Sequence, residues 1–124
     1  RYAGCYVVTL SVDQVTFRQP IHVGELVTFL ASVNFTGSSS MEIGVKVIAE
    51  NIRTRVVRHA NSCFFTMVAV DDDGKPTPVT PRVPANEEEK RRFEAARLRR
   101  QLRQELERRF KAIQDGQPDP SAKA

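Results

Sequence analysis

The densest group of chemically active side chains is a cluster of cations near the C-terminus. Residues 91–111 hold eight arginines and one lysine: Arg91, Arg92, Arg97, Arg99, Arg100, Arg103, Arg108, Arg109 and Lys111. Such a cluster can bind nucleic acid, an acidic membrane or a phosphorylated small molecule. Glutamates alternate with these arginines and no aromatic residue is placed to stack on bases, so we expect no nucleic-acid partner.

Histidine and cysteine are too scattered to predict a metal or redox site. His22 and His59 have no Cys or Asp partner at ligand spacing, so the sequence predicts no metal ion. Cys5 and Cys63 lie in apolar, strand-like runs and could form a bridge. No other feature indicates secretion, so we expect both to be reduced core residues.

The length of 124 residues allows one domain with an extension. No apolar run approaches the ~20 residues that span a bilayer, and the N-terminus does not resemble a signal peptide. We therefore expect a cytoplasmic protein without membrane association. The first residue is Arg1 rather than Met, so we expect the chain to begin within a longer protein.

A sheet must position most of the other residues. In residues 7–12 apolar side chains occupy every second position, but after Gln14 the pattern changes phase to Val15 and Phe17. Because strand side chains alternate with period 2, this change requires a bulge, a bend or a change of environment. Pro20 then ends the strand or places it at an edge.

Three further strands follow. Two alternating stretches, residues 27–35 and 41–49, are joined by the turn sequence TGSSS at residues 36–40. Residues 51–55 then lead to CFFTMVAV at residues 63–70, which is apolar on both faces as a central strand is. DDDGKP ends that strand. We therefore expect four long antiparallel strands.

A proline-rich stretch and a helix complete the chain. Prolines make residues 75–84 extended, and we interpret them as a spacer, with an SH3-type ligand as the alternative. Asn86 and Glu89 form a capping-box pattern that begins a helix within residues 85–115. Residues 116–124 are expected to be a disordered tail. The helix carries one apolar stripe: Leu98, Leu102, Leu106, Phe110 and Ile113.

Three motifs carry a family resemblance. They are V-D-x-V-x-F-x-x-P-I-x-V-G-E from Val12, S-S-M-E-x-G-V-K-V from Ser39 and F-x-x-V-A-V-D from Phe65. Together they resemble the hotdog-fold acyl-CoA thioesterases from residue 3 to about residue 84. The closest group has single domains in bacteria and tandem pairs in animals, and the Arg-rich helix resembles the tail of that group.

The resemblance implies an α+β fold in which a curved antiparallel sheet wraps around one long, buried helix. In the family that helix precedes the strand that begins near Val7. Residues 1–84 would therefore be the C-terminal two-thirds of a hotdog domain. The family's catalytic groups lie on or near the central helix, and no position here aligns with them. We expect the catalytic residues before Arg1, and interpret Asp13, Glu25 and Glu42 as solvated or edge carboxylates.

The family's coenzyme A contacts carry over to three places. The first is the strand segment Leu10, Ser11 and Val12, the second is Ser39, Ser40 and Met41, and the third is Arg100. Strand backbone can bind the pantetheine arm, turn hydroxyls and amides can hold phosphate oxygens, and a guanidinium can bind phosphate or stack on adenine. Each of these places also has a plainer interpretation. Leu10–Val12 can be ordinary strand residues, Ser39 and Ser40 ordinary turn residues, and Arg100 one solvated charge among many.

The implied function is hydrolysis of acyl-CoA to a free fatty acid and CoA, with CoA entering only as part of the substrate and product and no separate cofactor. A non-catalytic acyl-CoA-binding or scaffold subunit is the alternative. The family implies a homodimer or a trimer of dimers. Residues 1–124 alone are expected to be inactive and to aggregate or fold without cooperativity, because their apolar stripes lack the central helix as a cover.

Overall fold

The computed structural model describes residues 1–13 and 15–121. The chain divides into two compact units, Arg1–Val83 and Pro84–Ala124. The first is a five-stranded antiparallel sheet, and the second contains the helix α1, Glu87–Gln114. The expected antiparallel sheet and C-terminal helix of an α+β chain are thus confirmed.

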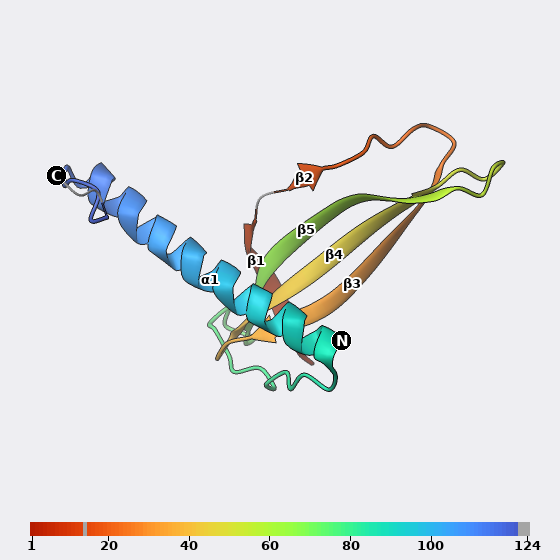
Figure 1. The fold of residues 1–124 in the computed structure, drawn as a ribbon. Coiled ribbons are helices and arrows are strands. Elements are labelled where there is room, and N and C mark those ends of the chain that lie inside the picture. The colour runs from red at the N-terminus through yellow and green to blue at the C-terminus, as the bar shows by residue number, and fades with distance from the viewer. Residues whose placement is uncertain (14, 122–124) are drawn as a thin grey trace. The chain divides into compact units, whose positions relative to one another are not determined.

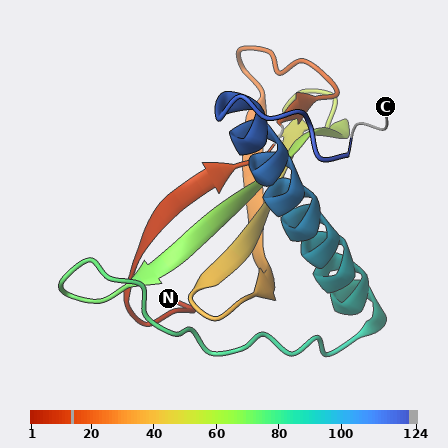
Figure 2. The same ribbon diagram turned by 90° about the vertical axis from the view of Figure 1, so that its left-hand side faces the viewer.

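The sheet has the strand order β1-β5-β4-β3, and β2 pairs separately with β5. Figure 1 shows β5, in green, between β1 and β4, and Figure 2 shows the twist of the same strands from the side. Every pair of neighbouring strands is antiparallel. The strand bounds are Tyr6–Val12 for β1, Thr16–Phe17 for β2, Leu26–Thr36 for β3, Ser40–Glu50 for β4 and Val57–Val70 for β5.

The long first strand predicted from the sequence is divided into β1 and β2. Both pair with β5, and the register of β1 shifts at a bulge between Thr9 and Ser11. The predicted phase change falls near Gln14, which lies outside the described residues. On either side of it, Asp13 and Val15 lie outside the strands, and the prediction of a bend or bulge there stays a prediction.

The fourth predicted strand is present and contains the apolar segment 63–70. After the predicted connection at residues 51–55, β5 begins at Val57 and pairs with β4 as far as Glu50. Its first half is polar and carries no alternating pattern, so local sequence gave no strand signal. Pairing with β4 outweighs this weak propensity, and a register shift opposite Val47 and Ile48 accommodates the extra residue.

The two cysteines occupy different environments. Cys63 is buried in β5 as predicted, and its burial raises the pKa of the thiol. Cys5 is exposed in the bend that precedes β1. The prediction of a core position for Cys5 is therefore wrong, because the chain reaches the sheet only at Tyr6. Both thiols are free in the structure.

The first unit has a small core and many exposed apolar side chains. Met41, Ala69 and Val79 form its buried cluster, and among the described residues no large side chain is fully buried. Several large apolar side chains of the sheet remain more than half exposed: Leu10, Val12, Phe17, Leu26, Phe29 and Leu30. Such an apolar surface is unusual for a soluble monomer and indicates that the sheet needs a cover.

The helix begins as the sequence predicts. The Asn86 side chain accepts a hydrogen bond from the Glu89 backbone N–H at 2.9 Å, and Glu89 accepts one from the Ala85 N–H at 2.7 Å. Within the first turns of α1, Arg92 donates to Glu88 at 2.6 Å. After the helix, Asp119 binds Arg109, so part of the predicted tail contacts the helix. Residues 122–124 lie outside the described residues.

A buried polar network links β3 to β4. The Asn34 amide donates a hydrogen bond to Glu42 at 3.3 Å and accepts one from the Ser32 hydroxyl at 2.8 Å. Glu42 is only 5 % exposed. Our interpretation of Glu42 as a solvated or edge carboxylate is therefore wrong, because β3 and β5 flank β4 and remove its side chain from water. Asn34 sits at a register shift between Val33 and Phe35.

Gly44 leaves the space that this network occupies. A Cβ atom at Gly44 would lie 2.4 Å from the Asn34 amide nitrogen. We expect Gly44→Ala to lower the free energy of unfolding by about 1–3 kcal/mol, the usual cost of overpacking. Urea denaturation of the wild type and the variant measures this difference.

The matched control uses an Asn34→Ala background, in which the clashing amide is gone. There Gly44→Ala should cost much less, because the two sites are coupled through one space. Equal costs in both backgrounds would show that the Asn34 side chain does not require glycine at position 44.

Candidate functional site

The structure brings two of the three predicted coenzyme A segments to the same end of the sheet. Thr9 of β1 pairs with Met67 of β5, and Met67 pairs on its other side with Met41 of β4. The segments around Leu10 and Ser40 therefore lie on either side of β5, about 10 Å apart across two strand spacings. Sequence alternation alone could not show this, because it does not determine strand order.

The β1 segment offers an irregular and open strand edge. Leu10 lies at the bulge, and its side chain is 63 % exposed. Ser11 pairs with Thr66, and the Ser11 hydroxyl oxygen is buried without a hydrogen-bond partner in the described structure. A bulge leaves backbone groups outside the regular ladder. This segment can therefore donate and accept hydrogen bonds with an extended chain laid along it.

The second segment is the turn between β3 and β4. The Ser39 carbonyl accepts a hydrogen bond from the Ala69 N–H at 2.8 Å, and the Ser40 carbonyl accepts one from the Gly37 N–H at 2.8 Å. Both serines are half-buried. Met41 differs, because only 4 % of it is exposed. A ligand at this turn can meet the serine hydroxyls, whereas Met41 is buried between Thr36 of β3 and Met67 of β5.

The third predicted contact, Arg100, lies in α1 of the second unit. The structure does not fix the distance between α1 and the sheet, so it does not bring Arg100 together with the other two segments. The roles of Leu10, Ser11, Val12, Ser39, Ser40, Met41 and Arg100 in binding coenzyme A stay predictions.

An open depression lies beside the first strand. Its lining comes from the start of β1 and the end of β5: Gly4, Cys5, Tyr6, Val70, Asp71, Asp72 and Thr77. Two aspartates in the lining make it unfavourable for a phosphate group. The phosphate end of a nucleotide would therefore be repelled by this depression.

Potential metal ligands are scattered over the described part of the chain. Within residues 1–13 and 15–121 no three His, Cys, Asp or Glu side chains are grouped so that they could hold a metal ion. The His59 ring nitrogen Nε2 lies 2.7 Å from the Ser62 hydroxyl and 2.9 Å from the Asn61 carbonyl. Over the same residues, no helix has the length and apolar character needed to cross a membrane.

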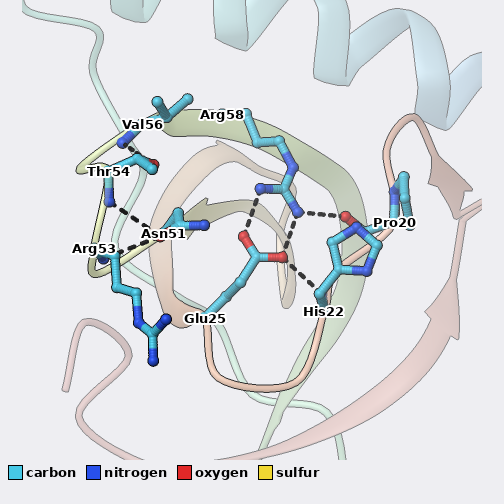
Figure 3. Close-up of polar contacts among 8 residues, drawn as sticks. All are labelled: Pro20, His22, Glu25, Asn51, Arg53, Thr54, Val56 and Arg58. Carbon is cyan, nitrogen blue, oxygen red and sulfur yellow. Dashed lines mark hydrogen bonds and ion pairs between the residues drawn. The ribbon is translucent and has the colours of Figure 1, made fainter.

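An ion pair that the sequence did not predict holds the opposite end of β5. Arg58 donates to both carboxylate oxygens of Glu25, at 2.5 and 2.6 Å, and to the Pro20 carbonyl at 2.6 Å. The His22 backbone N–H also donates to Glu25, at 2.7 Å (Figure 3). The Glu25 side chain is 6 % exposed. We interpreted Glu25 as a solvated or edge carboxylate. It lies beside the end strand β3, but it is not solvated.

This ion pair fixes the loop between β2 and β3 against the start of β5. It uses both oxygens of Glu25, so the carboxylate is not available as a base. Arg58 and the neighbouring backbone N–H lower the pKa of Glu25 to about 2 from its ordinary value of 4.5. Arg58 is about ten residues along β5 from the serine turn, roughly 33 Å at the rise of a strand.

The depressed pKa predicts how stability depends on pH. Because the folded-state pKa is below the unfolded value, the stabilisation by Glu25 is complete above about pH 4.5 and is lost as the pH falls toward 2. We expect the melting temperature of Glu25→Gln to fall less steeply than that of the wild type between pH 5 and 2. Thermal unfolding followed by circular dichroism measures both profiles.

Arg58→Met is the matched control, since it removes the cation and keeps most of the apolar stem. It should give the same flattened profile as Glu25→Gln. A wild-type slope in either variant over this range would contradict the assignment of the acid-sensitive stability to this pair.

Comparison with known proteins agrees with this architecture. The thioesterase superfamily matches residues 1–56. The VdlD protein of Helicobacter pylori is 54 % identical over 103 residues, which cover 83 % of this chain and 59 % of VdlD. The chain therefore spans about three-fifths of the length of this relative.

Two solved structures share the fold. An apo-hexameric acyl-CoA thioesterase is 40 % identical, with a TM-score of 0.81 over 85 % of this chain and 67 % of its own. The acyl-CoA hydrolase of Staphylococcus aureus, solved with butyryl coenzyme A, coenzyme A and coenzyme A disulfide, is 34 % identical. Its TM-score is 0.79 over 92 % of this chain and 68 % of its own. The chain belongs to the hotdog-fold acyl-CoA thioesterase family.

Proposed function

We propose that the protein hydrolyses acyl-CoA thioesters, releasing a free fatty acid and CoA, and that this chain supplies the surface that binds CoA. The observation that carries the proposal is the match to the S. aureus acyl-CoA hydrolase over 92 % of this chain, a protein solved with CoA compounds. The positions of two predicted CoA segments on either side of β5 support it.

The reaction requires water to add to the thioester carbonyl carbon. The carbon–sulfur bond then breaks, the acyl group leaves as a carboxylic acid and the CoA sulfur takes the proton. Within this chain we assign no residue to the activation of water. Glu25 is held by Arg58 and Glu42 lies in the Asn34 network, so neither carboxylate is placed for that task.

The chain's own residues act on the other end of the substrate. The open edge at Leu10–Val12 pairs with the amides of the pantetheine arm, and the hydroxyls of Ser39 and Ser40 hold phosphate oxygens. Arg100 binds a phosphate or stacks on adenine. The phosphate and adenine contacts lie far from the thioester, so we expect the loss of one of them to weaken substrate binding more than it slows the chemical step.

We also propose that the protein works as a homodimer or a trimer of dimers. An acyl-CoA thioesterase of known structure that resembles this chain is hexameric. The exposed apolar side chains of the sheet, such as Phe17 and Phe29, offer surface for assembly.

The direct test is thioester cleavage by the full-length protein. A thiol reagent reports CoA release from acyl-CoA, and calorimetry reports CoA binding. Hydrolysis above the buffer rate supports the proposal. CoA binding without hydrolysis would favour the alternative of a non-catalytic acyl-CoA-binding subunit, and the loss of both would overturn each function.

Arg100→Ala is expected to raise KM for acyl-CoA and leave kcat nearly unchanged, as the loss of uniform binding does. A hydrogen bond to a charged group contributes about 1.5–3 kcal/mol, so KM should rise about tenfold or more. Steady-state kinetics at low ionic strength measure the effect. The control is Arg108→Ala, because Arg108 is an exposed residue on the same helix. An unchanged KM for Arg100→Ala would remove Arg100 from the site.

Ser39 and Ser40 are expected to touch the ligand directly. In a crystal structure of the protein with CoA, at least one of their hydroxyl or backbone groups should lie within hydrogen-bond distance of CoA. Clear density for CoA with no atom of Ser39, Ser40 or Met41 near it would contradict this assignment.

A further inference from the structure

The proline-rich residues 75–83 are attached to the sheet along their length. We call this segment the strap. We interpreted this stretch as a spacer, but its backbone continues the hydrogen bonding of β5. The Thr77 N–H donates to the Ala69 carbonyl at 2.9 Å, and Pro76 forms an isolated bridge with Val70. Figure 2 shows the strap leaving β5 and passing the turn between β3 and β4.

The strap also binds the serine turn itself, at two points. The Val79 N–H donates to the Ser38 carbonyl at 2.9 Å, and the Arg82 N–H donates to the Thr36 hydroxyl at 2.7 Å. These two contacts lie on either side of Gly37. The strap is therefore attached to the turn that carries Ser39 and Ser40.

Apolar packing and the N-terminus fix the strap in turn. The Val79 side chain is only 7 % exposed and packs in the buried cluster with Met41 and Ala69. From the other side, the Tyr2 hydroxyl donates to the Thr80 carbonyl at 2.8 Å. Burial of a valine contributes about 1.5 kcal/mol or more, so Val79 is an effective anchor.

The composition of the turn explains why such a support matters. Residues 37–40 are one glycine and three serines, a sequence that is flexible when nothing holds it. The strap carries prolines, which restrict its own backbone. A stiff segment that binds a flexible one reduces the conformational entropy that the turn would lose when it binds a ligand.

We propose that the strap is a positioning element. Through the contact between Arg82 and Thr36, it holds the serine turn in the conformation that binds the phosphate groups of CoA. This inference rests on the proposed function. It goes beyond that function in assigning to Thr36, Val79 and Arg82 a role in the affinity for the nucleotide end of the substrate. None of the three needs to touch the ligand.

The test separates nucleotide binding from the rest of the reaction. Thr36→Val in the full-length protein removes the acceptor of the Arg82 N–H and keeps the shape of the side chain. We expect KM for acyl-CoA to rise about three- to tenfold with kcat unchanged. KM for the matching acyl-pantetheine, which has no phosphates or adenosine, should stay within about twofold of the wild type.

Two further variants serve as controls. Thr36→Ser keeps the hydroxyl and should restore the wild-type KM. Thr28→Val makes the same change near the other end of β3, on an exposed residue, and should have no effect on either substrate. If Thr36→Val fails to fold, Tyr2→Phe tests the same element, because it removes the Tyr2–Thr80 hydrogen bond at an exposed position.

Several outcomes would overturn the proposal. They are an unchanged KM for acyl-CoA in folded Thr36→Val, an equal rise for both substrates, or a fall in kcat alone. If Thr36→Val does not fold, an unchanged KM in Tyr2→Phe overturns the proposal in the same way. A wild-type protein that cleaves no thioester overturns the proposed function instead. In that event calorimetry with CoA and with pantetheine still tests the strap, since only the affinity for CoA should weaken in the variants. Equal affinities for CoA in wild type and variants would then refute it.

Discussion

Backbone hydrogen bonding along both edges of β5 is the interaction on which the rest of the first unit depends. One edge of this strand pairs with β1 and then β2, and the other edge pairs with β4 from Ser40 to Glu50. Because the first unit has a small core, these ladders supply much of its order. The candidate CoA segments are near each other only because β5 lies between them.

The two ends of β5 have different tasks. Near Val57 the sheet is closed by the Glu25–Arg58 ion pair and by the turn that begins at Asn51. The Asn51 side chain accepts hydrogen bonds from the Arg53 and Thr54 N–H groups (Figure 3). Near Val70 the strap, the serine turn and the start of β1 meet. Groups at the first end bind one another, whereas the second end leaves hydroxyls and an irregular edge available to a ligand.

Sequence patterns predicted the parts of the fold that local chemistry determines. The alternation in residues 27–35 and 41–49 gave β3 and β4, and Asn86 with Glu89 gave the start of α1. Partners in space could not be predicted. Alternation assigns Glu42 to a face, but its burial depends on the neighbouring strands, and nothing near Glu25 in the sequence indicates Arg58. The prolines of the strap showed an extended chain without showing that it returns to Ser38.

The late position of β5 in the chain has a consequence for synthesis on the ribosome. β3 and β4 are joined by a short turn and can pair as soon as both have emerged, whereas β1 and β2 must wait for residues 57–70. During that interval an exposed strand edge with apolar side chains such as Val8 and Phe17 is open to other nascent chains. The strap follows β5, so the serine turn acquires its support last, and the end of the sheet near Val70 is the final part of the first unit to form.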